Sequence, residues 1–149
     1  MRAQGKEWFT YYPGVPKFGN MRLEHIAIWV DDLEMMRQFY ETYFNGVVGD
    51  KYTNVQKNFQ SYFISFSGGA RIEMMHQPPL VASHHAEINK TRGYAHLAMS
   101  LGSKAKVNEM TERFRSEGFK IVGEPRTTGD GYYESVILDP EGNRIELTV

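Results

Sequence analysis

The chain has 149 residues, of which 41% are hydrophobic and 23% charged, and its formal net charge is -1 at pH 7. These values are typical of one globular domain and give no general attraction to nucleic acid or to an anionic membrane. No apolar run approaches the roughly 20 residues that span a bilayer, and the N-terminus lacks the apolar core of a signal peptide, so we expect a cytoplasmic protein. Because the chain has no Cys, any metal ion must be held by nitrogen and oxygen.

The first 20 residues differ from the rest of the chain. They are rich in aromatic residues and show no helical or strand period, whereas a regular pattern begins just after Met21. We expect residues 1–20 to form an arm that packs on the body or on a partner chain, because exposed aromatic side chains are unfavourable in water. The alternative is an extension that precedes the native start.

The first patterned segment, residues 22–30, alternates as a strand does. His25, Ala27 and Trp29 fall on one face, and aliphatic residues occupy the other. Asp31 can then cap a helix and Glu34 can complete a capping box, with apolar residues at helical spacing as far as Asn45-Gly46. Strand patterns follow at residues 47–53, 59–66 and 70–75.

The second half runs in the same order. Residues 94–101 alternate, with His96 on the less aliphatic face, and Ser103 can cap a helix that ends at Gly118. Strand patterns then fit residues 119–123, 132–138 and 144–149, the last two joined by a turn rich in Asp, Gly and Asn. Each half therefore predicts the order β-α-β-β-β.

Two short matches make this repeat concrete. His25-Ile26-Ala27 parallels His96-Leu97-Ala98 at an offset of 71 residues, and Arg71-Ile72-Glu73 parallels Arg144-Ile145-Glu146 at an offset of 73. One such match is weak, but two matches at nearly equal offsets in corresponding strands indicate an internal duplication.

The duplicated His and Glu residues have the pattern of metal ligands. In each half they lie on the face of the sheet that the amphipathic helix does not cover, so His25, Glu73, His96 and Glu146 should point into the space between the sheets. A Glu in a sheet cavity costs several kcal/mol unless it is paired or bound to a cation. Taken singly, each His is a hydrogen-bonded strand residue and each Glu is solvated or paired with Arg71 or Arg144. The symmetric set favours a metal site.

With these motifs the chain resembles the vicinal oxygen chelate superfamily, which includes glyoxalase I, methylmalonyl-CoA epimerase, extradiol dioxygenases and bleomycin-resistance proteins. The resemblance covers residues 21–149 and rests on the segments at 25–34, 93–98 and 139–146. It implies an α+β fold of paired βαβββ modules, at about 21–76 and 93–149 and joined by loop 77–92. Curved mixed sheets would enclose a central metal cavity, with the helices outside. Many members are homodimers in which one metal takes ligands from both chains; others keep the site within one chain.

Within that superfamily, His and Glu in both halves look most like glyoxalase I. This implies a metal-dependent lyase or isomerase that acts on a small oxygen-chelating substrate through an enediolate, with Zn, Ni, Co, Mn or Fe at His25, Glu73, His96 and Glu146. By the same resemblance, Glu146 or Glu73 would act as the catalytic base, and we favour Glu146.

The resemblance also implies substrate contacts, two of which differ from the residues that glyoxalase I enzymes place at the same positions. Trp29 stands where many glyoxalase I enzymes place an Arg that binds glutathione, and Gln77 stands where they often place Asn. This pattern argues against glutathione as the substrate. We also expect Phe63 to be core or cavity wall, and Tyr133 to lie at the rim of the pocket.

Two other functions are compatible with the motifs. One is a non-catalytic protein of the antibiotic-resistance type, which would bind a small molecule between the modules. The other is an extradiol-type dioxygenase, which needs only two His and one Glu for iron and is disfavoured by the additional Glu73.

Overall fold

The computed structural model describes residues 22–80 and 93–149, so the predicted N-terminal arm and most of the predicted linker lie outside the described residues. The elements of the first module are β1 (His25–Trp29), α1 (Leu33–Phe44), β2 (Val47–Val48), β3 (Tyr52–Asn54), β4 (Phe59–Ser65) and β5 (Arg71–His76). Those of the second module are β6 (Leu97–Ser100), α2 (Lys104–Ser116), β7 (Ile121–Thr127), β8 (Tyr133–Leu138) and β9 (Arg144–Thr148). No helix within the described ranges is both long and apolar enough to cross a bilayer.

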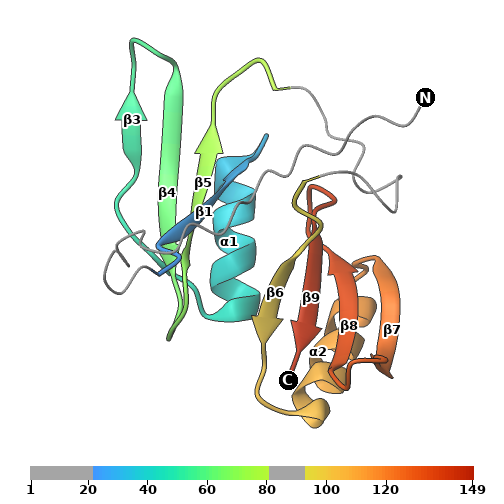
Figure 1. The fold of residues 1–149 in the computed structure, drawn as a ribbon. Coiled ribbons are helices and arrows are strands. Elements are labelled where there is room, and N and C mark those ends of the chain that lie inside the picture. Colours follow the sequence, from blue (N-terminus) through green and yellow to red (C-terminus); the bar gives the residue numbers. More distant parts are fainter. Residues whose placement is uncertain (1–21, 81–92) are drawn as a thin grey trace, which may run out of the picture.

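Each module folds into its own mixed sheet, and the two sheets stand apart in Figure 1. The strand orders are β1-β5-β4-β2, with β3 also paired to β4, and β6-β9-β8-β7. In both sheets the first strand runs parallel to the last, which places Ala27 beside Glu73 and Ala98 beside Glu146. The shared register confirms the predicted α+β fold of paired βαβββ modules. The predicted strand at 47–53 is two short strands instead, β2 and β3.

Helix α1 begins one residue later than predicted. Its N-cap is Asp32, whose carboxylate accepts hydrogen bonds from the backbone N–H groups of Glu34 and Met35. The Glu34 side chain does not close the predicted capping box, because it turns towards other partners. The predicted end of the helix is confirmed: Asn45 adopts the left-handed conformation, with φ of 52°, that commonly terminates helices.

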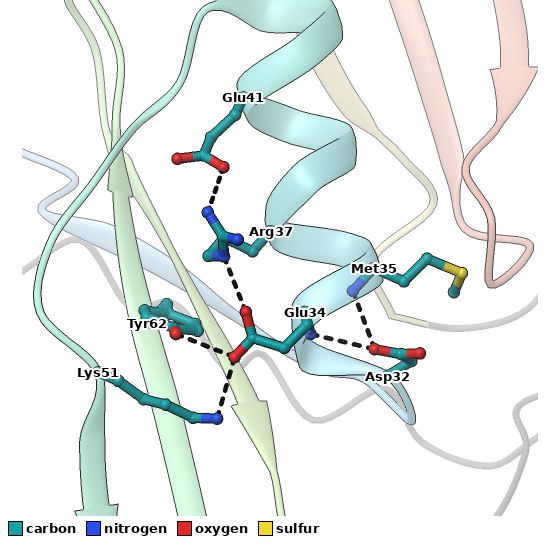
Figure 2. Close-up of polar contacts among 7 residues, drawn as sticks. All are labelled: Asp32, Glu34, Met35, Arg37, Glu41, Lys51 and Tyr62. Atoms are coloured by element: carbon teal, nitrogen blue, oxygen red, sulfur yellow. Dashed lines mark hydrogen bonds and ion pairs between the residues drawn. The ribbon is translucent and has the colours of Figure 1, made fainter.

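The Glu34 carboxylate instead joins helix α1 to the first sheet, as Figure 2 shows. It accepts hydrogen bonds from Arg37 at 2.9 Å, from Lys51 at 3.0 Å and from the Tyr62 hydroxyl at 3.0 Å. The hydrogen bonds from Lys51 and Arg37 hold the pKa of Glu34 well below its ordinary value of 4.5, at about 2. The ionised carboxylate therefore stabilises the folded state.

We expect Glu34→Gln to lower the free energy of unfolding at pH 7 by roughly 0.5–1 kcal/mol, because the side chain is 51% exposed and solvent screens its partners. The folded-state pKa of about 2 lies below the unfolded value of 4.5, so the contribution is complete above pH 4.5 and disappears as the pH falls towards 2. Urea unfolding of both proteins at pH 7 and pH 3 measures this. Glu112→Gln, which removes a looser pair with Arg115 on α2, is the control. An equal difference at both pH values would contradict the assignment.

The two modules share one core that is built around their helices. Phe39 and Tyr43 of α1 contact Phe114 of α2, with ring centroids 5.9 and 4.7 Å apart, and Phe119 closes the same cluster. A second contact comes from the turn before β9, where the Glu141 carboxylate accepts hydrogen bonds from the backbone N–H groups just before α1. The modules are therefore held together on the helix side of their sheets.

Candidate metal centre

The first His–Glu pair lies on the face of the first sheet that α1 does not cover. On β5, Ile72 and Met74 are buried in the core, whereas Glu73 between them points to the other face and keeps 18% of its side chain exposed. His25 at the start of β1 lies on that same open face, and its Nε2 is 3.7 Å from Oε2 of Glu73. Strand alternation therefore produces this pair without any loop contribution.

The second module repeats the arrangement. Ile145 and Leu147 of β9 are buried, and Glu146 between them points to the open face with 16% of its side chain exposed. His96, directly before β6, places its Nε2 3.4 Å from Oε2 of Glu146. The duplication seen in the sequence is thus also a duplication of side-chain geometry.

The structure brings each His to its own Glu, but it does not bring the two pairs together. Among the described residues, which include all four of these side chains, no three His, Asp or Glu groups are placed to share one ion. The two pairs are therefore separate within the described part of the chain, and the four-ligand site stays a prediction. The aromatic core joins the modules through their helices, on the sides of the two sheets that lie opposite the His–Glu pairs.

Each pair nevertheless has the geometry of half a metal site. Two ligand atoms at about 2.1 Å from one ion, seen from it at 90° to 110°, lie roughly 3.0–3.4 Å apart. The two His–Glu separations of 3.7 and 3.4 Å are close to that range and longer than a good hydrogen bond. Nitrogen and carboxylate oxygen donors suit a first-row divalent ion, so the residues present fit one.

The surroundings of His25 include a residue that the sequence patterns did not indicate. Nδ1 of His25 contacts the carboxylate of Glu24, which is also paired with Arg71. The hydrogen bond from His25, together with Arg71, lowers the pKa of Glu24. A carboxylate on Nδ1 leaves Nε2 to face Glu73, as in many metal sites where a second carboxylate orients the ligating His. In the sequence, the signal that could have indicated Glu24 is its position directly before His25.

Phe63 and Arg71 complete the wall of the first pair. The Phe63 ring meets the His25 ring edge-on at 5.3 Å, and the Arg71 guanidinium lies over the same Phe63 ring at 4.2 Å. Phe63 is also the direct neighbour of Glu73 across the sheet. The structure therefore places this predicted substrate contact beside His25 and Glu73.

The surroundings of Glu146 differ from those of Glu73. Glu134 of β8 hydrogen-bonds Glu146 and is itself held by Arg126 at 2.9 Å. Burial raises the pKa of Glu146, and the nearby Glu134 carboxylate raises it further. Two carboxylates in contact disfavour double ionisation unless a cation lies near, and Arg126 is one such cation.

Tyr133, a predicted substrate contact, packs towards helix α2. Its hydroxyl donates a hydrogen bond to Asn108 of α2 at 2.7 Å, and the Lys104 ammonium lies over its ring. Because strand neighbours alternate, it is Glu134 that points to the open face beside Glu146.

Trp29 and Gln77 lie at the other end of the first open face. The Trp29 side chain is 50% exposed and meets the Phe59 ring edge-on at 6.1 Å. The Gln77 side-chain amide donates to the backbone carbonyl of Lys57, so it joins the end of β5 to the β3–β4 connection. Trp29 is therefore available to a ligand, whereas the amide nitrogen of Gln77 is already engaged.

Sequence comparison identifies the family. The profile of the Glyoxalase/Bleomycin resistance protein/Dioxygenase superfamily matches residues 22–147. The chain belongs to this superfamily. Members of the superfamily typically bind a metal ion and small-molecule substrates, and they often form dimers.

Individual superfamily relatives are distant. The chain is 27% identical over 134 residues to the uncharacterized protein YqjT of Bacillus subtilis, covering 84% of this chain and 96% of that one. A glyoxalase family protein from Bacillus cereus superposes with a TM-score of 0.74 at 21% identity, covering 90% and 97% of the two chains. Trypanothione-dependent glyoxalase I of Leishmania major superposes with a TM-score of 0.67 at 21% identity, and the match covers 87% of this chain and 86% of that one.

Glyoxalase I from Zea mays also shares the fold, with a TM-score of 0.67 at 22% identity over 85% of this chain. The match spans only 44% of the maize chain, so that enzyme is a protein of more than twice the matched length. At these identities the structural comparisons establish the superfamily fold and leave the reaction to the side chains of the site.

Proposed function

We propose that this protein is a metal-dependent lyase or isomerase of the glyoxalase type, acting on a small substrate that chelates the metal through neighbouring oxygens. The observation that carries the proposal is the pair of equivalent His–Glu sets, His25 with Glu73 and His96 with Glu146, at matching registers of two sheets. If one His–Glu set had only a structural role in its own module, there would be no reason for the other module to carry an equivalent set.

A complete site needs two chains. Each open face presents two ligands, and no three His, Asp or Glu groups of the described residues come together within one chain. In a two-fold symmetric dimer, the first module of one chain can face the second module of its partner, which gives two identical four-ligand sites. A divalent ion there would supply Lewis-acid polarisation of a substrate carbonyl or hydroxyl and would stabilise an enediolate.

The residues of the chain supply the remaining chemistry. Glu146 is the stronger candidate for the base that takes a proton from the carbon next to the polarised group, because burial and Glu134 already disfavour its charged form. The Phe63 ring shields His25 and Glu73 from water on one side, and Glu24 keeps the His25 ring oriented. Such shielding strengthens every electrostatic interaction within the site.

Two alternatives make different predictions. A binding protein without catalysis would need the walls of the site but no stoichiometric metal. An extradiol-type dioxygenase would need iron, and in it Glu73 would be dispensable as a ligand. The symmetric placement of Glu73 and Glu146 favours the lyase or isomerase.

Elemental analysis of protein purified without chelator tests the proposal. We expect about one divalent ion per chain, because two shared sites per dimer amount to one per subunit. The ion should be lost in His25→Ala and kept in His76→Asn, a His of the same module whose Nδ1 contacts the Val30 carbonyl instead. Turnover of hemithioacetals and of catechols, with Zn, Ni, Co, Mn and Fe(II) supplied in turn, then separates the reactions. Absence of stoichiometric metal would favour the binding protein, and turnover of catechols alone would favour the dioxygenase.

A further inference from the structure

Three aromatic side chains form a strip on the open face of the first sheet. The strip consists of Trp29 on β1, Phe59 on β4 and Tyr52 on β3, with ring centroids 6.1 Å apart for Trp29 and Phe59 and 6.0 Å apart for Phe59 and Tyr52. Trp29 and Tyr52 are 50% and 55% exposed. Large aromatic side chains that gather with their rings exposed indicate a binding surface more often than single exposed ones do.

The strip lies on the same strands as the first half of the proposed metal site. Trp29 follows His25 by four residues on β1, and Phe59 precedes Phe63 by four residues on β4, so all four side chains point to one face. At about 3.3 Å per strand residue, the strip is roughly 13 Å from His25 and Phe63. Metal ligands at one end and aromatic rings at the other are thus parts of one continuous surface.

The surface between the two ends is low only along β1. Ala27 is the only β1 side chain on this face between His25 and Trp29, and it is exposed. Further across the sheet, Met75 of β5 lies between Trp29 and Ser61, and Ser61 is covered by its neighbours at 2% exposure. An unbranched chain that joins the two ends would therefore run along β1, over Ala27.

The chemistry of the strip favours one class of occupant. The three side chains of the strip carry no charge, so an anionic tail finds no paired cation on them, whereas a planar apolar ring gains edge and face contacts with all three. We infer that the substrate carries a planar aromatic ring on a chain that places it against Trp29 while its neighbouring oxygens reach the metal ligands. This inference rests on the proposed function, since the metal centre anchors the other end of the ligand.

Two hydroxamic acids allow the contribution of the ring to binding to be measured separately from that of the chelating group. Acetohydroxamic acid and 6-phenylhexanohydroxamic acid offer the same two oxygens, and only the second carries a ring on an extended chain. Binding to Ni²⁺-loaded and Zn²⁺-loaded protein is measured by calorimetry and, in a Trp8→Phe background, by the fluorescence of Trp29, which is then the only Trp in the chain.

We expect the phenyl compound to bind about 10-fold more tightly than acetohydroxamic acid and to change the Trp29 fluorescence, as one well-placed aromatic contact does. Trp29→Ala should remove this advantage and leave acetohydroxamic acid binding unchanged, whereas Trp29→Phe should keep most of it.

The possible outcomes distinguish a failure of the ring-binding inference from a failure of the proposed function. If both compounds bind wild type equally, or if the advantage persists in Trp29→Ala, the ring-binding role of the strip is overturned and the metal centre stands. If Trp29→Ala changes the sedimentation of the protein without changing ligand affinity, the strip is a subunit contact and the inference fails. If acetohydroxamic acid does not bind metal-loaded protein, the proposed function fails, and the inference fails with it.

Discussion

Co-expression of His25→Ala and His96→Ala chains is expected to restore activity that neither variant has alone. In a dimer with shared sites, the heterodimer combines both substitutions in one site and leaves the other with all four native ligands. Heterodimers isolated through two different affinity tags should therefore show about half of the wild-type activity and bind about one metal ion per dimer. Each homodimer should lose most of its metal, because one imidazole is missing from every site.

The matched control places both substitutions in the same module. A heterodimer of His25→Ala with Glu73→Ala carries one altered ligand in each shared site, so it should show no restored activity. If the His25→Ala and His96→Ala pair also fails to regain activity while still forming dimers, the sites lie within single chains and the shared arrangement is wrong. The experiment thus depends on which residues meet and is independent of the identity of the ion.

Glu146→Gln is expected to reduce turnover by about 100-fold or more while the protein keeps its metal. An amide oxygen can still ligate a divalent ion, but it cannot accept the proton that the proposed reaction removes from carbon. Glu73→Gln makes the same change in the other pair and should have a much smaller effect on turnover. Metal content and steady-state kinetics of the two variants measure the difference.

The comparison rests on the unequal surroundings of two otherwise equivalent residues. Glu146 contacts Glu134, which Arg126 holds in place, whereas Glu73 has Phe63 as its neighbour across the sheet. Equal losses in the two variants would show that both carboxylates take part in proton transfer. A larger loss in Glu73→Gln would transfer the role of base to the first module and contradict our assignment.

Local sequence was sufficient wherever one strand or one turn decides the result. Alternation placed Glu73 and Glu146 on open faces opposite buried Ile and Leu residues, and the structure confirms this. The ends of the helices near Asn45 and Gly118 were also predicted, because backbone conformations with positive φ favour Asn and Gly. The capping box at Glu34 was predicted wrongly, since Lys51 and Tyr62, which compete for its carboxylate, lie far from it in the sequence.

Glu134 was missed for the same reason, whereas Glu24 was missed although it adjoins His25 in the sequence. Glu24 and Glu134 gain their roles only from contact with His25 and Glu146, and Glu134 reaches Glu146 through strand pairing that spans the last turn. Tyr133 and Glu134 point to opposite faces of β8, and only the pairing of β8 with β9 places Glu134 beside Glu146. A shift of one residue exchanges the two faces completely.

The amino-acid sequence by itself determined the duplication, the βαβββ order of each module and the two His–Glu pairs, because strand periodicity and short repeats are local properties. Only the tertiary structure decided how the modules are joined. The contacts of Phe39 and Tyr43 with Phe114 bury the helices against one another and direct the open faces away from this shared core. Packing between distant aromatic residues, which no local pattern encodes, therefore joins the modules through their helices, and our proposal assigns each complete metal centre to two chains.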